Sequence, residues 1–258
     1  TRLAFKMTRF KMFKKNISIL YIYMKNIIII TPFKVGSTSL SLNLKKNYGY
    51  VEIWEQNTSW KNYIDKNGII LRGHTDINYD LLNNKKFDIW FTVIRKPTEI
   101  YLSGYFQDID TKGYEYYYGK KRTLNANTDT LLNHFMSFEW NKMHQFSFDW
   151  NFNEIYKYTG VKIYDEHFDR KKGYAIYKSK IKNIMVCVIT LNDLNNKMNQ
   201  IFNELEISPN DKNINVFHDN LSTNKWYKDK IFDLKKNLPK SYFNKYKKED
   251  TKIVDHFF

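Results

Sequence analysis

Apolar runs that alternate with amphipathic stretches set the pattern of the first hundred residues. Residues 26–31 contain four consecutive isoleucines, and residues 88–94 form another long apolar segment. Runs of this kind predict strands that are buried on both faces of a parallel sheet. Shorter apolar segments at residues 50–54 and 69–72 predict two further strands.

Helical patterns lie between and after these strands. Leu40 and Leu44 recur at helical spacing within residues 38–45, and Pro97 fits the first turn of a helix that continues to residue 107. Strands that alternate with helices predict an α/β fold with an open parallel sheet flanked by helices. Further along the chain, the pattern predicts helices at residues 130–138, 151–158, 191–205 and 226–238, and a late strand pair at residues 174–178 and 184–190.

The chain has no internal repeat and no linker rich in Pro, Gly or Ser. We therefore expect one α/β domain over residues 26–258, preceded by a basic extension over residues 1–25. The extension is either an amphipathic membrane-surface anchor or a plain extension, with the functional domain starting at Met24. We favour the second interpretation, and we expect residues 1–25 to contribute nothing to a ligand site.

The formal net charge of +15 suggests a nucleic-acid or membrane partner at first sight. Its distribution weakens that idea: residues 1–25 hold seven basic and no acidic side chains, and residues 223–258 hold ten against five. Residues 26–222 hold 25 against 22, so the excess lies mostly at the two ends. We expect no nucleic-acid partner for the domain, and only weak membrane-surface contact through the extension.

The sequence also disfavours a membrane-spanning protein and a metal-binding protein. No stretch reaches the roughly 18 apolar residues of a membrane helix, so we expect a cytoplasmic protein, with membrane association as the alternative. Cys187 is the one cysteine and lies in an apolar run, which predicts a buried strand thiol. Without a Cys/His cluster at ligand spacing, we expect no metal site.

The segment at residues 31–39 (TPFKVGSTS) joins a buried strand to a helix, which is the geometry of a phosphate-binding loop. Gly36 lets the backbone approach an anion, Lys34 adds a charge, and Ser37, Thr38 and Ser39 supply the amides of the open helix N-terminus. The same residues also fit a glycine turn with a Ser/Thr helix cap. The nucleoside-triphosphatase pattern with Gly-Lys-Ser/Thr is absent, as is a clear magnesium-binding Asp, and both absences disfavour a small-molecule kinase.

A second sequence element supports the prediction of a phosphate-binding site. Arg95 ends the strand at residues 88–94, and Ser103 follows eight residues later, two helical turns on. Both can converge on an anion at the carboxyl end of the sheet. The combination of this Arg-x-Pro and Ser element with the earlier Lys-x-Gly-Ser-Thr loop resembles the sulfotransferase superfamily.

This resemblance implies a sulfotransferase-like fold and a nucleotide donor, 3′-phosphoadenosine-5′-phosphosulfate. The loop at residues 34–39 would hold the 5′-phosphosulfate, and Arg95 and Ser103 the 3′-phosphate. A narrower resemblance, to capsular polysaccharide synthesis proteins named for an Asn-Lys-Trp-Tyr-Ser signature, rests on residues 153–155, 161–164, 167–174 and 224–227. Lys228 stands where that signature has Ser, which puts the role of that serine in doubt.

His74 is the candidate catalytic base for an acceptor hydroxyl. It follows the predicted strand at residues 69–72, lies between the two anion motifs, as in many sulfotransferases, and can titrate near neutrality. The alternative for His74 is a hydrogen-bonded structural histidine, and Asp76 could orient it or act as the base itself. Lys34 is the candidate stabiliser of the leaving group.

The sequence thus predicts sulfuryl transfer to a hydroxyl, with a carbohydrate as the expected acceptor and no metal ion. Two alternatives remain at this point: a small-molecule kinase, and a basic protein without catalytic activity that binds nucleic acid or a membrane surface on a degenerate nucleotide fold.

Overall fold

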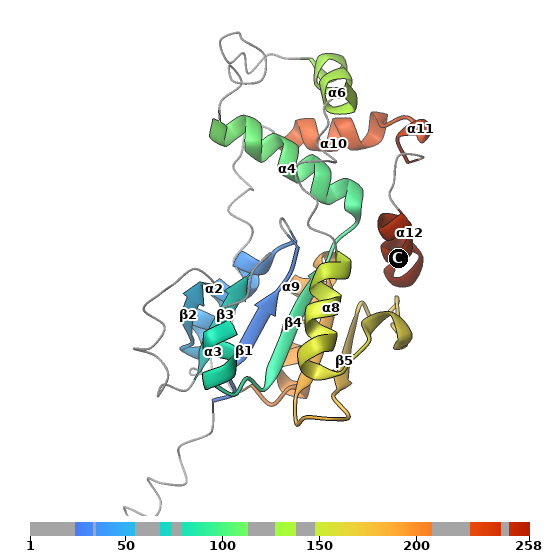
Figure 1. Cartoon of the computed structure of the whole chain (residues 1–258). Helices are drawn as coiled ribbons and strands as arrows, with labels where there is room; N and C mark the ends of the chain where they lie inside the picture. Colours follow the sequence, from blue (N-terminus) through green and yellow to red (C-terminus); the bar gives the residue numbers. More distant parts are fainter. Residues whose placement is uncertain are drawn as a thin grey trace, which may run out of the picture.

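A six-stranded sheet forms the centre of the protein, in the strand order β2-β3-β1-β4-β6-β5 (Figure 1). The computed structural model describes residues 24–32, 35–54, 68–73, 79–112, 127–137, 148–207, 228–243 and 248–258. The strands are β1 (Ile27–Ile30), β2 (Val51–Trp54), β3 (Ile69–Gly73), β4 (Ile89–Ile94), β5 (Tyr174–Lys178) and β6 (Met185–Thr190).

The sheet is mixed, which corrects the expectation of a purely parallel one. Strands β2, β3, β1, β4 and β6 pair in parallel, whereas β5 lies antiparallel to β6 at the edge. Only residues 179–184 connect β5 to β6. A connection this short permits a hairpin, because a parallel crossover needs about a dozen residues or more.

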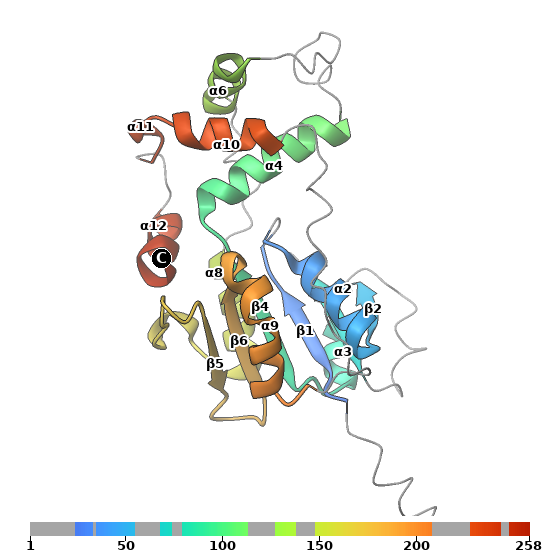
Figure 2. The ribbon, with the colours of Figure 1, turned by 180° about the vertical axis from the view of Figure 1, so that it is seen from behind.

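Helices cover both faces of the sheet. Figures 1 and 2 show α2 and α9 on one face and α3 and α8 on the other. The helices are α2 (Ser37–Tyr48), α3 (Tyr79–Asn84), α4 (Pro97–Lys112), α6 (Thr128–Ser137), α8 (Phe148–Thr159), α9 (Leu191–Glu204), α10 (Lys228–Asn237), α11 (Lys240–Phe243) and α12 (Lys248–Phe257), with a short 3-10 turn at Ile163–Asp165.

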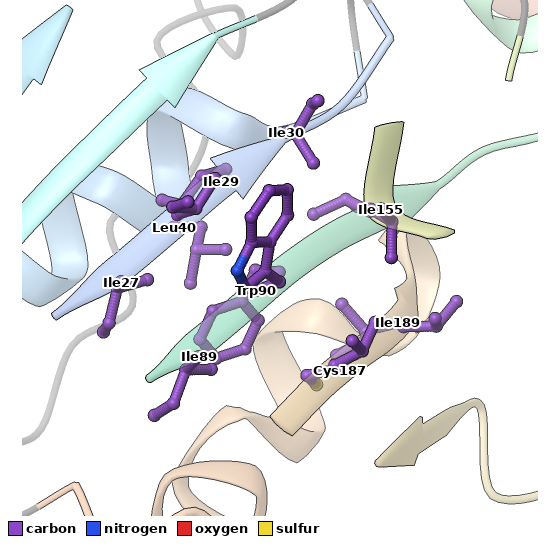
Figure 3. Close-up of a cluster of buried hydrophobic side chains, with 14 of the residues drawn as sticks. Ile27, Ile29, Ile30, Leu40, Ile89, Trp90, Ile155, Cys187 and Ile189 are labelled. Atoms are coloured by element: carbon purple, nitrogen blue, oxygen red, sulfur yellow. The ribbon is translucent and has the colours of Figure 1, made fainter. Parts of the chain in front are cut away.

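The main core surrounds β1 and β4. All four isoleucines of β1 are at most 1% exposed. On β4, Trp90 stacks on Tyr158 of α8 at 5.6 Å between ring centroids, while its neighbour Phe91 meets Phe202 of α9 at 6.3 Å. Successive side chains of one strand therefore enter opposite layers, and Figure 3 shows the packed cluster around Trp90.

A second, smaller core lies beyond the carboxyl ends of the parallel strands, where α4, α6, α10 and α11 gather (Figure 1). Its buried members are Tyr101, Leu102, Tyr105, Phe106, Leu131, Phe135, Leu234 and Tyr242. Ile100 of α4 belongs to the main core, so this helix enters both cores. We refer to α4, α6, α10 and α11 as the helical layer.

The structure confirms each predicted strand, with ends shifted by a residue or so, and the helices expected after them. The last predicted helix does not close the chain, because α12 follows it and buries Ile253 and Phe257. Met24 and Lys25 contact the domain: Met24 packs against Gly68, and Lys25 Nζ donates to the Leu205 carbonyl at 2.8 Å. Residues 1–23 of the predicted extension lie outside the described residues.

Replacing Phe202 with Ala should lower the free energy of unfolding by about 3–5 kcal/mol, because the side chain is 1% exposed and fills space between α9 and β4. Phe232 of α10 is the matched control, since it is 68% exposed. Phe232→Ala should stay within about 0.5 kcal/mol of the parent in urea denaturation. Equal losses for the two variants would contradict the assigned core.

Candidate functional site

Helix α2 begins with an open N-terminus at the carboxyl end of β1. Gly36 is its N-cap, with φ 96° and ψ 13° in the left-handed region, and its carbonyl accepts the amide of Leu40 at 3.2 Å. A glycine has no side chain with which to cap the helix, and the first turn contains no acidic residue. The helix dipole at this turn therefore favours an anion.

The residues of the predicted loop differ in their burial. Ser37 is 4% exposed, Ser39 is half-buried and Thr38 is exposed. A Cβ on Gly36 would lie 2.5 Å from Leu191 Cδ1, at the start of α9. The N-termini of α2 and α9 therefore approach each other closely at this edge, and the contact needs a glycine.

Arg95 lies at the same edge of the sheet, directly after β4. Strands β1 and β4 are neighbours in parallel, with Ile29 level with Phe91. The chain leaves β1 toward β2 and leaves β4 toward β5, in opposite directions across the sheet. Ligands of open α/β sheets bind at such a switch point, so the geometry brings the α2 N-terminus and Arg95 to one candidate anion site.

Arg95 is paired within this site. Its side chain is 20% exposed, and its Nε lies 3.5 Å from Oε2 of Glu99, in the first turn of α4. Burial lowers the pKa of the Arg95 guanidinium, while Glu99 opposes that shift. The guanidinium stays charged at neutral pH, because the ordinary arginine pKa lies above 12.

Glu99 is bound from a second side by the helical layer. Its Oε1 accepts from Lys235 Nζ of α10. Burial raises the pKa of the Glu99 carboxyl, but Lys235 and Arg95 together lower it below its ordinary value. Glu99 is therefore ionised at neutral pH and shared between two cations.

Ser103 lies on α4, half-buried, four residues beyond Glu99. Residues four apart share a helix face, so Glu99 and Ser103 lie on one stripe that continues from Arg95. Glu99 stands between the two residues that were expected to bind a 3′-phosphate. Sequence reasoning missed it, although its spacing of four from Arg95 is the signal for such a pair.

The two predicted catalytic side chains, His74 and Lys34, lie outside the described residues, as do Asp76 and residues 224–227. The strand that leads to His74 is described: β3 ends at Gly73, beside β1 and at the carboxyl edge. The role of His74 therefore stays a prediction.

A buried cation on β3 was not anticipated from the sequence. Arg72 is 4% exposed, and its Nε lies 3.1 Å from Oε1 of Glu52 on β2. The other Glu52 oxygen lies 3.2 Å from Lys45 Nζ of α2. Because Glu52 compensates its charge, we assign Arg72 to the support of β2, β3 and α2.

In the described part of the chain, no helix combines the length and the apolar character needed to cross a bilayer. The same residues bring together no group of three or more His, Cys, Asp or Glu side chains that could hold a metal ion. Cys187 is buried, as expected, and burial raises the pKa of its thiol.

Comparisons of the chain with protein-family models, with curated proteins and with solved structures found no match.

Replacing Gly36 with Ala should lower the free energy of unfolding by about 1–2 kcal/mol, because an L-residue is strained at this positive φ. The new methyl group would also press on Leu191. Thr38→Ala is the control in the same turn, and we expect it to change stability by less than about 0.5 kcal/mol. Urea denaturation of both variants tests this, and an unchanged Gly36→Ala midpoint would argue against the left-handed cap.

Proposed function

We propose that this protein is a sulfotransferase with a phosphate-binding loop and a sulfotransferase-like fold. It moves a sulfuryl group from 3′-phosphoadenosine-5′-phosphosulfate to a hydroxyl group, and we expect that hydroxyl to belong to a carbohydrate. One observation carries the proposal: the open N-terminus of α2 and the charge of Arg95 follow neighbouring strands at the switch point of the sheet.

The chemistry of these two elements suits a ligand with two separate anionic groups. A helix N-terminus with no side-chain cap from Gly36 and no first-turn carboxylate favours one anion. A guanidinium at the end of the neighbouring strand favours another. The donor nucleotide carries a phosphosulfate at the 5′ position and a phosphate at the 3′ position of one ribose. We assign Gly36, Ser37, Thr38 and Ser39, with Lys34, to the 5′ group, and Arg95 with Ser103 to the 3′-phosphate.

In the proposed transfer, the bond between sulfur and the leaving phosphate oxygen breaks as the bond between sulfur and the acceptor oxygen forms. Positioning and charge neutralisation dominate catalysis of such in-line transfers. His74 takes the proton of the acceptor hydroxyl, with Asp76 as its orienting partner or its substitute, and Lys34 neutralises the leaving oxygen. The scheme uses no metal ion.

We expect Arg95→Ala to weaken binding of adenosine 3′,5′-bisphosphate by about 2 kcal/mol or more, because a charged hydrogen-bond partner of the 3′-phosphate is lost. Binding of AMP, which lacks that phosphate, should barely change. Calorimetric titration of both nucleotides measures the difference.

Lys96→Ala is the matched control for this experiment, because it removes the same charge from the adjacent, exposed residue. Equal losses for the two nucleotides in Arg95→Ala would contradict the assignment. A thermal shift produced by ATP with magnesium, but not by the bisphosphate, would favour the kinase alternative, since ligands of the native state raise its stability.

Replacing His74 with Ala should lower sulfuryl transfer by about 100-fold or more while leaving adenosine 3′,5′-bisphosphate affinity unchanged, because the base does not hold the nucleotide. Transfer of labelled sulfate from the donor to a panel of saccharides measures the rate. Retained transfer in this variant, combined with its loss in Asp76→Asn, would shift the role of base to Asp76.

A further inference from the structure

The electrostatic attraction of Arg95 for an anion depends on whether the negative charge of Glu99 is compensated. Taken alone, Arg95 and Glu99 form a pair of zero net charge, and the Glu99 carboxylate would repel a phosphate that approaches the guanidinium. The same carboxylate lies on the stripe of α4 that leads to Ser103. An anion held by Arg95 and Ser103 would therefore lie beside a buried negative charge.

Lys235, which is distant in the sequence, adds a positive charge to the pair of Arg95 and Glu99. Its ammonium group contacts Oε1 of Glu99, whereas Arg95 Nε lies 3.5 Å from Oε2, at the long limit of a hydrogen bond. The three side chains together carry a net charge of about +1 at neutral pH, counted from their ordinary ionisation states. This cluster of three side chains is thus cationic only when Lys235 is included.

The position of Lys235 is set by packing. Its neighbour Leu234 is fully buried in the core of the helical layer, between α10 and α4. Glu99 lies in the first turn of α4, and its side chain is only 15% exposed. The burial of Leu234 therefore holds the ammonium group of Lys235 over a carboxylate that has little access to water.

We propose that Lys235 is a positioning residue for the anion site, because it neutralises the Glu99 carboxylate, which would otherwise repel a 3′-phosphate bound beside Arg95. This inference deepens the proposed function and rests on it. In this arrangement Glu99 orients Arg95, Lys235 compensates Glu99, and the helical layer controls the affinity for nucleotides that carry a 3′-phosphate.

The test measures the dissociation constants of adenosine 3′,5′-bisphosphate and of AMP for a set of full-length variants. Lys235→Ala should weaken bisphosphate binding by about five-fold, which is the effect of a half-exposed ion pair, and leave AMP binding unchanged. Lys235→Arg should restore the parent affinity. Lys236→Ala is the matched control, since it removes the same charge from the next, exposed residue of α10.

A double-mutant cycle separates this role from a general effect of charge or stability. In the Glu99→Gln background, Lys235→Ala should change bisphosphate affinity by less than about two-fold, because no carboxylate remains to be neutralised. An equal loss in Lys236→Ala, or a loss that persists in the Glu99→Gln background, would overturn the inference. A parent protein that binds AMP as tightly as the bisphosphate would instead overturn the proposed function, and the inference with it.

Discussion

Burial of β1 on both faces is the constraint on which the candidate site depends. Its four isoleucines are inaccessible to solvent, with β3 on one side and β4 on the other. A strand of this kind is stable only in the middle of a sheet, beneath helices on both faces. Later strands must then add on both sides of it, and the connections that leave β1 and β4 diverge. The topological switch point at their carboxyl ends follows from that divergence.

The second constraint at this edge is the free-energy cost of removing a charged side chain partly from water. A guanidinium that is only 20% exposed loses much of its hydration and gains from a nearby carboxylate. That carboxylate would cancel the attraction for an anion, and Lys235 offsets it from α10. The outcome is an arginine that is held in place and whose surroundings remain cationic. Arg72, Glu52 and Lys45 form a second cluster of two cations and one carboxylate. We assign that cluster to support of the fold, because Arg72 is only 4% exposed and joins β3 to β2.

The parts of the fold that could be predicted are those that local sequence determines. Continuous apolar runs located β1 and β4, and the residues immediately after them located Gly36 and Arg95. The contact of Glu99 with Arg95 could have been predicted, because the two residues are four apart at the start of a helix. Lys235 was not, since it is 136 residues from Glu99 and only the packing of α10 on α4 brings them together. Helix α12 was missed because its few apolar residues, such as Ile253 and Phe257, become informative only once they are buried.

Helix α4 links the two cores and so links the site to the helical layer. Ile100 packs in the main core with β1 and β4, while the next residues, Tyr101 and Leu102, pack in the core of the layer. The first turn of α4, which contains Glu99, is therefore fixed by both cores. A displacement of α10 against α4 would move Lys235 away from Glu99 and change the charge beside Arg95, although no residue that contacts the sheet had moved. The electrostatics of the sheet edge thus depend on packing in a separate hydrophobic core.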